Sequence, residues 1–143
     1  MSTEQTTVEI VSWSNTKAIL RGIREAVFIL EQHVPQELEW DDYDSQCTHV
    51  LALTDNNKPI GTGRILADGH IGRVAVLAPF RGKGVGSKIL FALINFAKNQ
   101  GMQRVFLHSQ SSAVPFYKRH GFVVVSDEFM DAGIPHRTME RIL

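Results

Sequence analysis

Residues 81–86 read Arg-Gly-Lys-Gly-Val-Gly and decide the fold, because they join a predicted strand to a predicted helix. After this segment, apolar side chains recur at helical spacing: Val85, Ile89, Leu93, Phe96 and Ala97. The first N–H groups of a helix have no partner inside the helix, and the helix dipole favours an anion there. Glycines let the backbone approach phosphates, and Arg81 and Lys83 add positive charge. The segment therefore predicts a loop that holds a pyrophosphate.

Two commoner phosphate-binding loops do not fit this segment. A Walker A loop requires Gly, four residues and then Gly-Lys-Ser/Thr, and no stretch of the chain has that spacing. A dinucleotide fingerprint requires Gly-x-Gly-x-x-Gly and an acidic residue about 20 positions later. Here Gly86 comes one position early, and the strand predicted at 104–109 has no acid. A glycine turn without a ligand is the remaining alternative, which three glycines and two basic residues before a helix disfavour.

The elements on either side of the loop alternate between strands and helices. Strands are predicted at 7–11, 49–54, 60–66, 70–77, 104–109, 122–125 and 136–142. Helices are predicted from a cap at Asn15 to the region closed by Pro35, from 85 to Gly101, and at 113–120, with the acidic stretch before 45 as a loop or a short helix. The order β-α-β-β-β-α-β-α-β-β predicts an α/β (α+β) mixed sheet with parallel pairing in its middle, in a single domain spanning 1–143.

Length and composition limit the classes of protein. The chain has 143 residues, enough for one domain with a core, and no apolar run approaches the roughly 20 residues of a membrane span. Residues 1–5 show no signal-peptide pattern, and a single cysteine, Cys47, excludes an internal disulfide framework. The net charge is zero, so we expect neither a nucleic-acid nor a membrane partner. These features favour a cytoplasmic protein.

The charges are unevenly distributed along the chain. Residues 25–57 contain no Lys or Arg, whereas residues 69–126 contain no Asp or Glu. This pattern indicates an anionic ligand on the central segment and a cationic one near the acidic segment, with solvated faces as the alternative for both. Residues 37–44 interleave acids with Trp40 and Tyr43, so they suit a cationic amine that is held by carboxylates and stacked on a ring.

Two motifs resemble the GNAT superfamily of N-acetyltransferases. Val74-Ala75-Val76 followed by residues 81–86 resembles its cofactor signature, Gln/Arg-x-x-Gly-x-Gly/Ala after a strand. Residues 113–122, Ala-Val-Pro-Phe-Tyr-Lys-Arg-His-Gly-Phe, resemble its second signature, Ala-x-x-x-Tyr-x-x-x-Gly-Phe. The strand order also matches, so the resemblance covers essentially the whole chain. Residues 27–28, 31–32, Pro35 and 133–136 further resemble its small ElaA-type branch.

The resemblance implies a fold and an activity. The fold is GNAT-like, with splayed central parallel strands. The activity is transfer of an acetyl group from acetyl-CoA to a primary amine, either a small cationic amine or a peptide or lysine amine, by direct attack in a ternary complex. The implied cofactor-binding residues are Val74, Ala75, Val76, Arg81, Gly82, Lys83, Gly84, Val85, Gly86 and Ser87. No metal is implied, and a homodimer is left open because many relatives form one.

The resemblance also implies catalytic groups. Tyr117 occupies the position of the general acid that protonates the leaving thiolate, for which a phenol with a pKa near 10 is suited, although a core tyrosine is the alternative. His70 occupies a position where some relatives carry the general base. Glu31 is expected to line the acceptor pocket. The other candidates for the general base are Glu31, His108, His136 and a water molecule.

Two other functions remain open because fold alone does not decide function. One is a CoA-binding regulatory or sensor domain with little turnover. The other is a nucleotide-binding module that uses the same loop for ATP.

Overall fold

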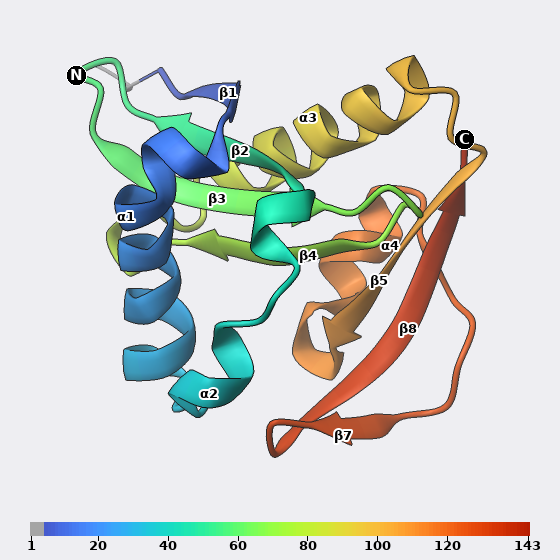
Figure 1. Cartoon of the computed structure of the whole chain (residues 1–143). Helices are drawn as coiled ribbons and strands as arrows, with labels where there is room; N and C mark the ends of the chain where they lie inside the picture. The colour runs from blue at the N-terminus through green and yellow to red at the C-terminus, as the bar shows by residue number, and fades with distance from the viewer. Residues whose placement is uncertain (1–4) are drawn as a thin grey trace.

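The structure, a computed structural model, describes residues 5–143 (Figure 1). Its strands are β1 (Thr7–Val11), β2 (Thr48–Leu53), β3 (Pro59–Ile65), β4 (Ile71–Val76), β5 (Arg104–Gln110), β6 (Val123–Val124), β7 (Phe129–Asp131) and β8 (Ile134–Ile142). Its α-helices are α1 (Trp13–Arg24), α2 (Gln36–Glu39), α3 (Val85–Asn99) and α4 (Val114–Arg119). A π-helix, η1 (Glu25–Glu31), continues α1, and single 3-10 turns are η2 (Asp44–Gln46), η3 (Ala78–Phe80) and η4 (Ser111–Ala113).

The strands form two antiparallel sheets that meet at one point. One sheet has the order β1-β2-β3-β4, and the other has the order β5-β8-β6 with β7 also paired to β8. Within residues 5–143, β4 and β5 are joined by a single parallel bridge between His70 and Phe106, where the Phe106 N–H donates to the Gly69 carbonyl at 3.0 Å. Beyond that bridge the strands are not paired. This arrangement confirms the mixed α/β fold with splayed central parallel strands.

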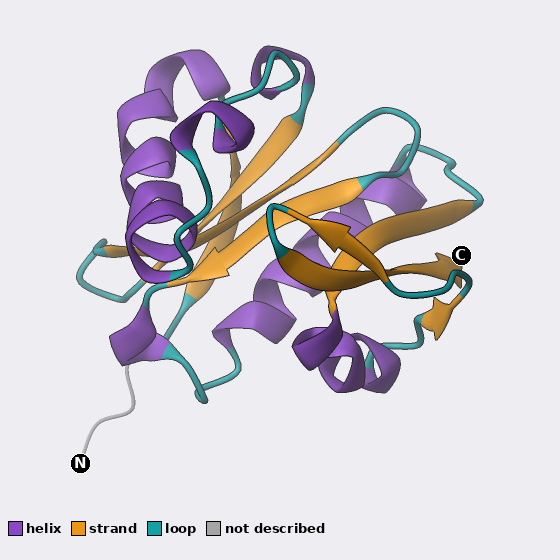
Figure 2. Ribbon diagram, turned by 90° about the horizontal axis from the view of Figure 1, so that it is seen from below, coloured by secondary structure: helices purple, strands orange, loops and turns teal. Residues whose placement is uncertain are grey.

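Helices cover both faces of the first sheet. Helices α1 and α2 lie on one face and α3 on the other (Figures 1 and 2). The larger core packs Ile89, Leu90 and Leu93 of α3 against β2, β3 and β5. Helix α3 lies so close to β3 that a Cβ added at Gly61 or Gly63 would stand 2.8 or 2.9 Å from an Ile89 methyl carbon. The smaller core lies under α1.

Strand β4 contains a bulge that matters for the site. Gly63 of β3 lies opposite two residues of β4, Arg73 and Val74, instead of one. Arg73 has a φ of +53°, in the left-handed region that a residue with a side chain rarely adopts. The extra residue changes which backbone groups of the strand face the unpaired edge.

Several predicted boundaries are wrong. The first helix begins at Trp13, two residues before the predicted cap at Asn15, because Ser12 is extended and its carbonyl accepts the N–H groups of Asn15 and Thr16. The helical region ends at Glu31, and Pro35 is the N-cap residue of α2 instead of closing the first helix. Strand β7 was not predicted because three residues are too short to show alternation.

Candidate active site

The predicted phosphate loop leaves the start of α3 open. Gly82 and Gly84 have φ values of +76° and +81°, and Gly84 is the N-cap residue of α3. Within the described residues no side chain caps this helix, and its first turn contains no acid. The loop from 81 to 84 is exposed. A helix N-terminus that is neither capped nor buried by protein is free to bind an anion through its N–H groups.

The edge of β4 beside the loop is also open. The Leu77 N–H donates to the Ile60 carbonyl of β3 at 2.9 Å. Because backbone groups alternate along an antiparallel ladder, the N–H and carbonyl of Val76 point away from β3. The Val76 carbonyl accepts a hydrogen bond from Arg81 Nε at 2.9 Å, which agrees with this orientation. The end of β4 therefore presents backbone groups next to the loop.

Arg81 and Glu31 lie together at this end of β4. Both guanidinium NH₂ groups of Arg81 bind the Glu31 carboxylate, and the Arg81 hydrogen bond lowers the pKa of Glu31 and raises the pKa of Arg81. The structure thus brings the predicted acceptor-site residue to the phosphate loop. Its carboxylate is paired with Arg81, and the two side chains are about two-fifths exposed, 42% for Glu31 and 41% for Arg81.

Tyr117 lies on α4, next to Phe116, which contacts the start of α3 at Gly86. Its ring makes edge contacts with Phe116 at 5.0 Å and Phe122 at 5.8 Å between centroids, and Phe116 in turn packs against the place where a Cβ of Gly86 would lie. Burial raises the pKa of Tyr117 to about 12. Within residues 5–143 its hydroxyl has no hydrogen-bond partner, so it can donate to a ligand.

His70 lies at the other end of β4 from Val76, at the bridge between the sheets. Its ring stacks on Phe106 with centroids 4.7 Å apart and meets the edge of the His108 ring at 4.8 Å. Burial is the main cause that lowers the pKa of both His70 and His108. The Nδ1 atom of His108 is 2.9 Å from Thr138 Oγ1. The imidazoles of His70 and His108 thus lie in contact, whereas His136 is buried and bonded to the Ile134 carbonyl.

The acidic stretch is largely neutralised inside the protein. Six charged side chains form a closed ring of ion pairs in which acids and arginines alternate: Arg24, Glu39, Arg73, Asp41, Arg64 and Asp44. The N···O distances lie between 2.6 and 3.2 Å. Trp40 lies under the guanidinium groups of Arg21 and Arg24, at 5.0 and 5.3 Å. Neither Glu39 nor Asp41 is a free carboxylate for an amine, and the Trp40 ring is already occupied.

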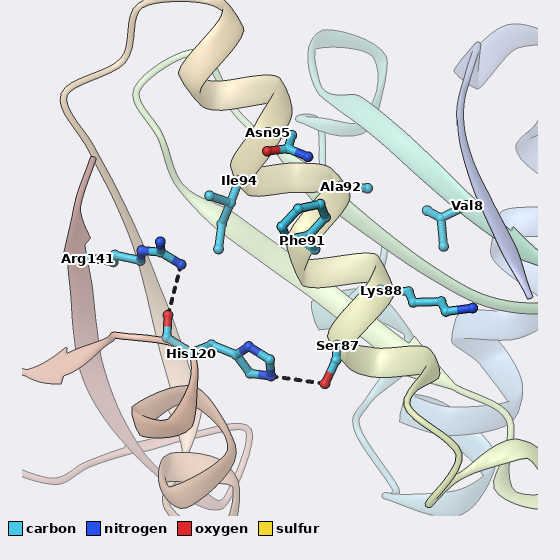
Figure 3. A pocket seen from close by; sticks show the side chains of 9 residues that line it. All are labelled: Val8, Ser87, Lys88, Phe91, Ala92, Ile94, Asn95, His120 and Arg141. Carbon is cyan, nitrogen blue, oxygen red and sulfur yellow. Dashed lines mark hydrogen bonds between the residues drawn. The ribbon is translucent and has the colours of Figure 1, made fainter.

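A pocket of about 540 Å³ lies against the first three turns of α3 (Figure 3). Its lining is Val8, Ser87, Lys88, Phe91, Ala92, Ile94, Asn95, His120 and Arg141. Ser87 and His120 point toward one another and share a hydrogen bond of 2.9 Å, and Arg141 donates to the His120 carbonyl at 3.0 Å. The lining combines apolar side chains with two basic ones, Lys88 and Arg141, and contains no carboxylate, so it is compatible with an anionic ligand that also has an apolar part.

Sequence reasoning missed two contacts at the site. The Gln110 side-chain amide donates to Gln32 Oε1 at 2.7 Å, which connects β5 to the segment after η1 across the diverging strands. The Ser87–His120 hydrogen bond joins α3 to the end of α4. The glycine after His120 marked a helix end, but no spacing rule connects residues 33 or 78 positions apart.

Among the described residues, no cluster of three or more His, Cys, Asp or Glu side chains could hold a metal ion. No helix in the described part of the chain has both the length and the apolar character required to cross a membrane.

Known proteins resemble this chain over nearly its whole length. The family described as "Acetyltransferase (GNAT) domain" matches residues 5–143. The chain therefore belongs to the GNAT acetyltransferase family and is an acyltransferase. It is 44% identical over 121 residues to the uncharacterized N-acetyltransferase YjcF of Bacillus subtilis, with 82% of this chain and 86% of YjcF covered.

ElaA of Escherichia coli is a further relative, 31% identical over 139 residues, with 92% of this chain and 90% of ElaA covered. The ElaA crystal structure superposes with a TM-score of 0.82 at 27% identity, covering 97% of this chain and 99% of ElaA. A GNAT family acetyltransferase from Elizabethkingia anophelis, crystallised with acetyl-CoA bound, shares the fold with a TM-score of 0.73 at 20% identity, covering 96% of this chain and 98% of that one. These relatives confirm the predicted superfamily.

Proposed function

We propose that the chain transfers an acetyl group from acetyl-CoA to a primary amine in a ternary complex. One observation carries this proposal: the uncapped start of α3 stands directly beside the open edge of β4, at the end where the two sheets have separated. A pyrophosphate on the helix start would extend the attached arm along that edge. A protein of the same fold has been crystallised with acetyl-CoA.

The three parts of acetyl-CoA have three proposed positions. Its pyrophosphate would bind the N–H groups of residues 82–87 and the Lys83 side chain. Its pantetheine arm would pair with the backbone of Val74, Ala75 and Val76, in the manner of an added strand. Its nucleotide would occupy the pocket beside Ser87, where His120 and Arg141 offer polar contacts. The absence of Asp and Glu from residues 69–126 supports this placement of the phosphate-bearing parts.

The chemistry assigned to the chain is acyl transfer to nitrogen. The amine nitrogen attacks the thioester carbonyl carbon, the C–N bond forms, the C–S bond breaks, and the sulfur leaves with the electron pair. We assign the Val76 N–H to the carbonyl oxygen, where negative charge develops. The proton lost by the amine is proposed to reach His70 through a chain of water molecules, because His70 lies at the other end of β4 from Val76 and its lowered pKa leaves its imidazole neutral near pH 7.

Tyr117 is proposed to act on the leaving sulfur. With a pKa of about 12, its phenol keeps its proton more firmly than a thiol with a pKa near 8.5 does. A full proton transfer from Tyr117 to the thiolate is therefore uphill. Donation of a hydrogen bond to the departing sulfur, with solvent completing the protonation, fits this pKa better than transfer in one step.

The acceptor is proposed to be a primary amine, with a small cationic amine and a peptide or lysine amine as the two candidates. The ion-pair ring has removed Glu39 and Asp41 as cation ligands. The exposed carboxylates of the stretch are Glu37 and Asp42. If the acceptor is cationic, these two are the groups that would attract it.

Thiol release from acetyl-CoA tests the proposed function. Purified protein is incubated with acetyl-CoA and, separately, polyamines, amino sugars, aminoglycosides and peptides, and free thiol is measured. We expect thiol release in the presence of one class of amine, and we expect a substitution of Gly84 to reduce this release. Cofactor binding without release for any amine would favour the sensor function, and protection by ATP but not by acetyl-CoA in thermal melting would favour the nucleotide module.

A further inference from the structure

Arg73 occupies an unusual position in β4. It is the left-handed residue of the bulge, and a residue with a Cβ pays about 1–2 kcal/mol for that conformation. Glycine adopts it without this cost, yet the chain has Arg here, directly after Gly72. The side chain of Arg73 must therefore provide something that glycine lacks.

The bulge decides which face of the sheet the side chains of β4 occupy. Ile71 and Val74 both belong to the core under α3, although they are three positions apart and strict alternation would place residues two apart on one face. Arg73 is thereby turned away from that apolar core. Its guanidinium lies on the α2 side, bound to Glu39 Oε2 at 3.0 Å and to Asp41 Oδ2 at 3.2 Å.

The bulge also decides which backbone groups face the open edge. With the extra residue, Leu77 lies opposite Ile60 and donates its N–H to β3. Without it, the register would shift by one, and Val76 would take the place opposite Ile60. The Val76 N–H would then be bonded to β3 instead of facing the gap. The position of the group assigned to the thioester oxygen thus depends on one extra residue.

The ring of ion pairs holds that residue from one side. Arg73 also donates to the carbonyl oxygens of Leu38 and Glu39, at 3.3 and 3.1 Å. Its two carboxylate partners are held in turn by Arg24 of α1 and Arg64 of β3. Four of the six charged side chains are buried, and Arg73 and Asp41 are about a quarter exposed. Burying charges costs desolvation energy that their attraction does little more than offset, so such a ring is weak evidence for stability alone. The ring of ion pairs instead fixes the position of the Arg73 side chain.

We propose that Arg73 is a positioning residue for acyl transfer: the ring of ion pairs holds its guanidinium on the α2 side and so maintains the bulge that directs the Val76 N–H into the open edge of β4. This inference rests on the proposed binding of acetyl-CoA along that edge. Arg73 itself touches neither substrate.

Three substitutions at one position test the proposal. Arg73→Gly removes the side chain from the ring of ion pairs but leaves the left-handed backbone conformation accessible. Arg73→Ala removes the side chain and also makes that conformation unfavourable. Arg73→Lys keeps the positive charge. We expect the affinity for acetyl-CoA, measured by calorimetry without an acceptor amine, to fall in the order Lys, Gly, Ala, with a loss for Ala of about tenfold or more, as for a displaced binding group. Arg104→Ala removes an exposed ion pair with Glu140 and is the matched control, with unchanged affinity.

Hydrogen exchange of two amides reports on the bulge without any ligand. In the wild type we expect the Leu77 amide to be protected and the Val76 amide to exchange faster. In Arg73→Ala we expect this difference to shrink or reverse, and in Arg73→Lys to be retained. If Arg73→Ala does not fold, Glu39→Gln, which weakens the ring from the other side, takes its place.

The outcomes separate this inference from the proposed function. A wild type that neither binds CoA nor releases thiol contradicts the proposed function, while the exchange pattern still tests the bulge. A wild type that binds acetyl-CoA, with variants whose melting temperature falls while acetyl-CoA affinity and the exchange pattern stay unchanged, overturns the positioning role and leaves Arg73 a structural residue only.

Discussion

Arg81 binds Glu31 through both of its NH₂ groups, with Nη1···Oε2 at 2.5 Å and Nη2···Oε1 at 2.7 Å, while its Nε donates to the Val76 carbonyl. The first residue of the phosphate loop is thereby fixed to the end of η1 and to the edge of β4 at once. Its guanidinium charge is offset by the Glu31 carboxylate. This contact joins the proposed cofactor site to the proposed acceptor side.

Glu31→Gln should strengthen CoA binding. The substitution releases the guanidinium of Arg81 from its carboxylate partner and leaves its charge near the proposed pyrophosphate site. We expect an increase in affinity of a few-fold at low salt, roughly the 0–1 kcal/mol of an exposed ion pair, and no increase at about 1 M salt, where such interactions are screened. Calorimetry at two salt concentrations measures this. Weaker binding at low salt would show that Glu31 positions Arg81 for the phosphate instead of competing with it.

Gly84→Ala should damage both the loop and CoA binding. The φ of +81° at Gly84 strains any residue with a Cβ, at a cost of about 1–2 kcal/mol, and relaxation of that strain would rotate the first N–H groups of α3. Gly22→Ala is the matched control, because Gly22 lies inside α1 with nothing within 4 Å of an added Cβ. We expect the control to raise stability by about 0.5–1 kcal/mol and to leave CoA affinity unchanged. Chemical denaturation and calorimetry on both variants decide the matter.

Tyr117→Phe should lower kcat by about a hundredfold or more, as expected for the loss of a group that assists the leaving atom, with CoA affinity unchanged. Because the pKa of Tyr117 is raised to about 12, the wild-type kcat should show no decline from phenol ionisation below about pH 11. Initial rates against pH for both proteins measure this. A wild-type decline near pH 9 that is missing in the Phe variant would contradict the raised pKa.

The value of kcat/KM should decrease as the pH is lowered, and the midpoint of this decrease should lie below pH 6.5. The base must be neutral, and burial lowers the pKa of His70, with the nearby His108 acting in the same direction. Activity therefore rises as pH increases through this lowered value and is already maximal near pH 7. His70→Gln should remove this acid limb along with most of the activity. A limb that survives His70→Gln and disappears in His108→Gln would transfer the role to His108.

Asp41 should make stability depend on pH at the acid end. Burial raises its pKa, but the hydrogen bond and charge of Arg64 outweigh that effect and lower the pKa to about 2. A depressed carboxyl pKa contributes stability above the unfolded value, near 3.9, and this stability is lost as pH falls toward 2. The difference in unfolding free energy between wild type and Asp41→Asn should be about 2 kcal/mol at pH 7 and should shrink below pH 4. An equal difference at pH 7 and pH 2.5 would contradict the ion pair.

Local patterns made the loop predictable, and distant contacts made the rest unpredictable. Gly82 and Gly84 mark left-handed positions that few other residues occupy, and the periodicity after them defines α3, so the site's central feature is visible in one short stretch. The order of strands and helices was also predicted from local patterns, whereas the splay of the central strands followed from the family resemblance. In contrast, the partner of Glu31 lies fifty residues away, and ion pairs at such separations leave no periodic signal.

The acidic stretch is a second feature whose contacts could not be predicted from the sequence. Its lack of Lys and Arg suggested a surface for cations, but Arg24, Arg64 and Arg73 reach it from α1, β3 and β4. Charge along a sequence does not show which charges the fold will pair. The left-handed conformation of Arg73 could not be predicted either, because glycine is the residue type that indicates this conformation in a sequence.

Amide chemical shifts recorded during a titration with CoA test the central claim most directly. We predict that the largest changes fall on residues 82–87 at the start of α3 and on Val74 and Val76 along the edge of β4, and that the amides of α2 move little. Binding that leaves those two segments unchanged while shifting amides elsewhere would show that the cofactor site has been put in the wrong place.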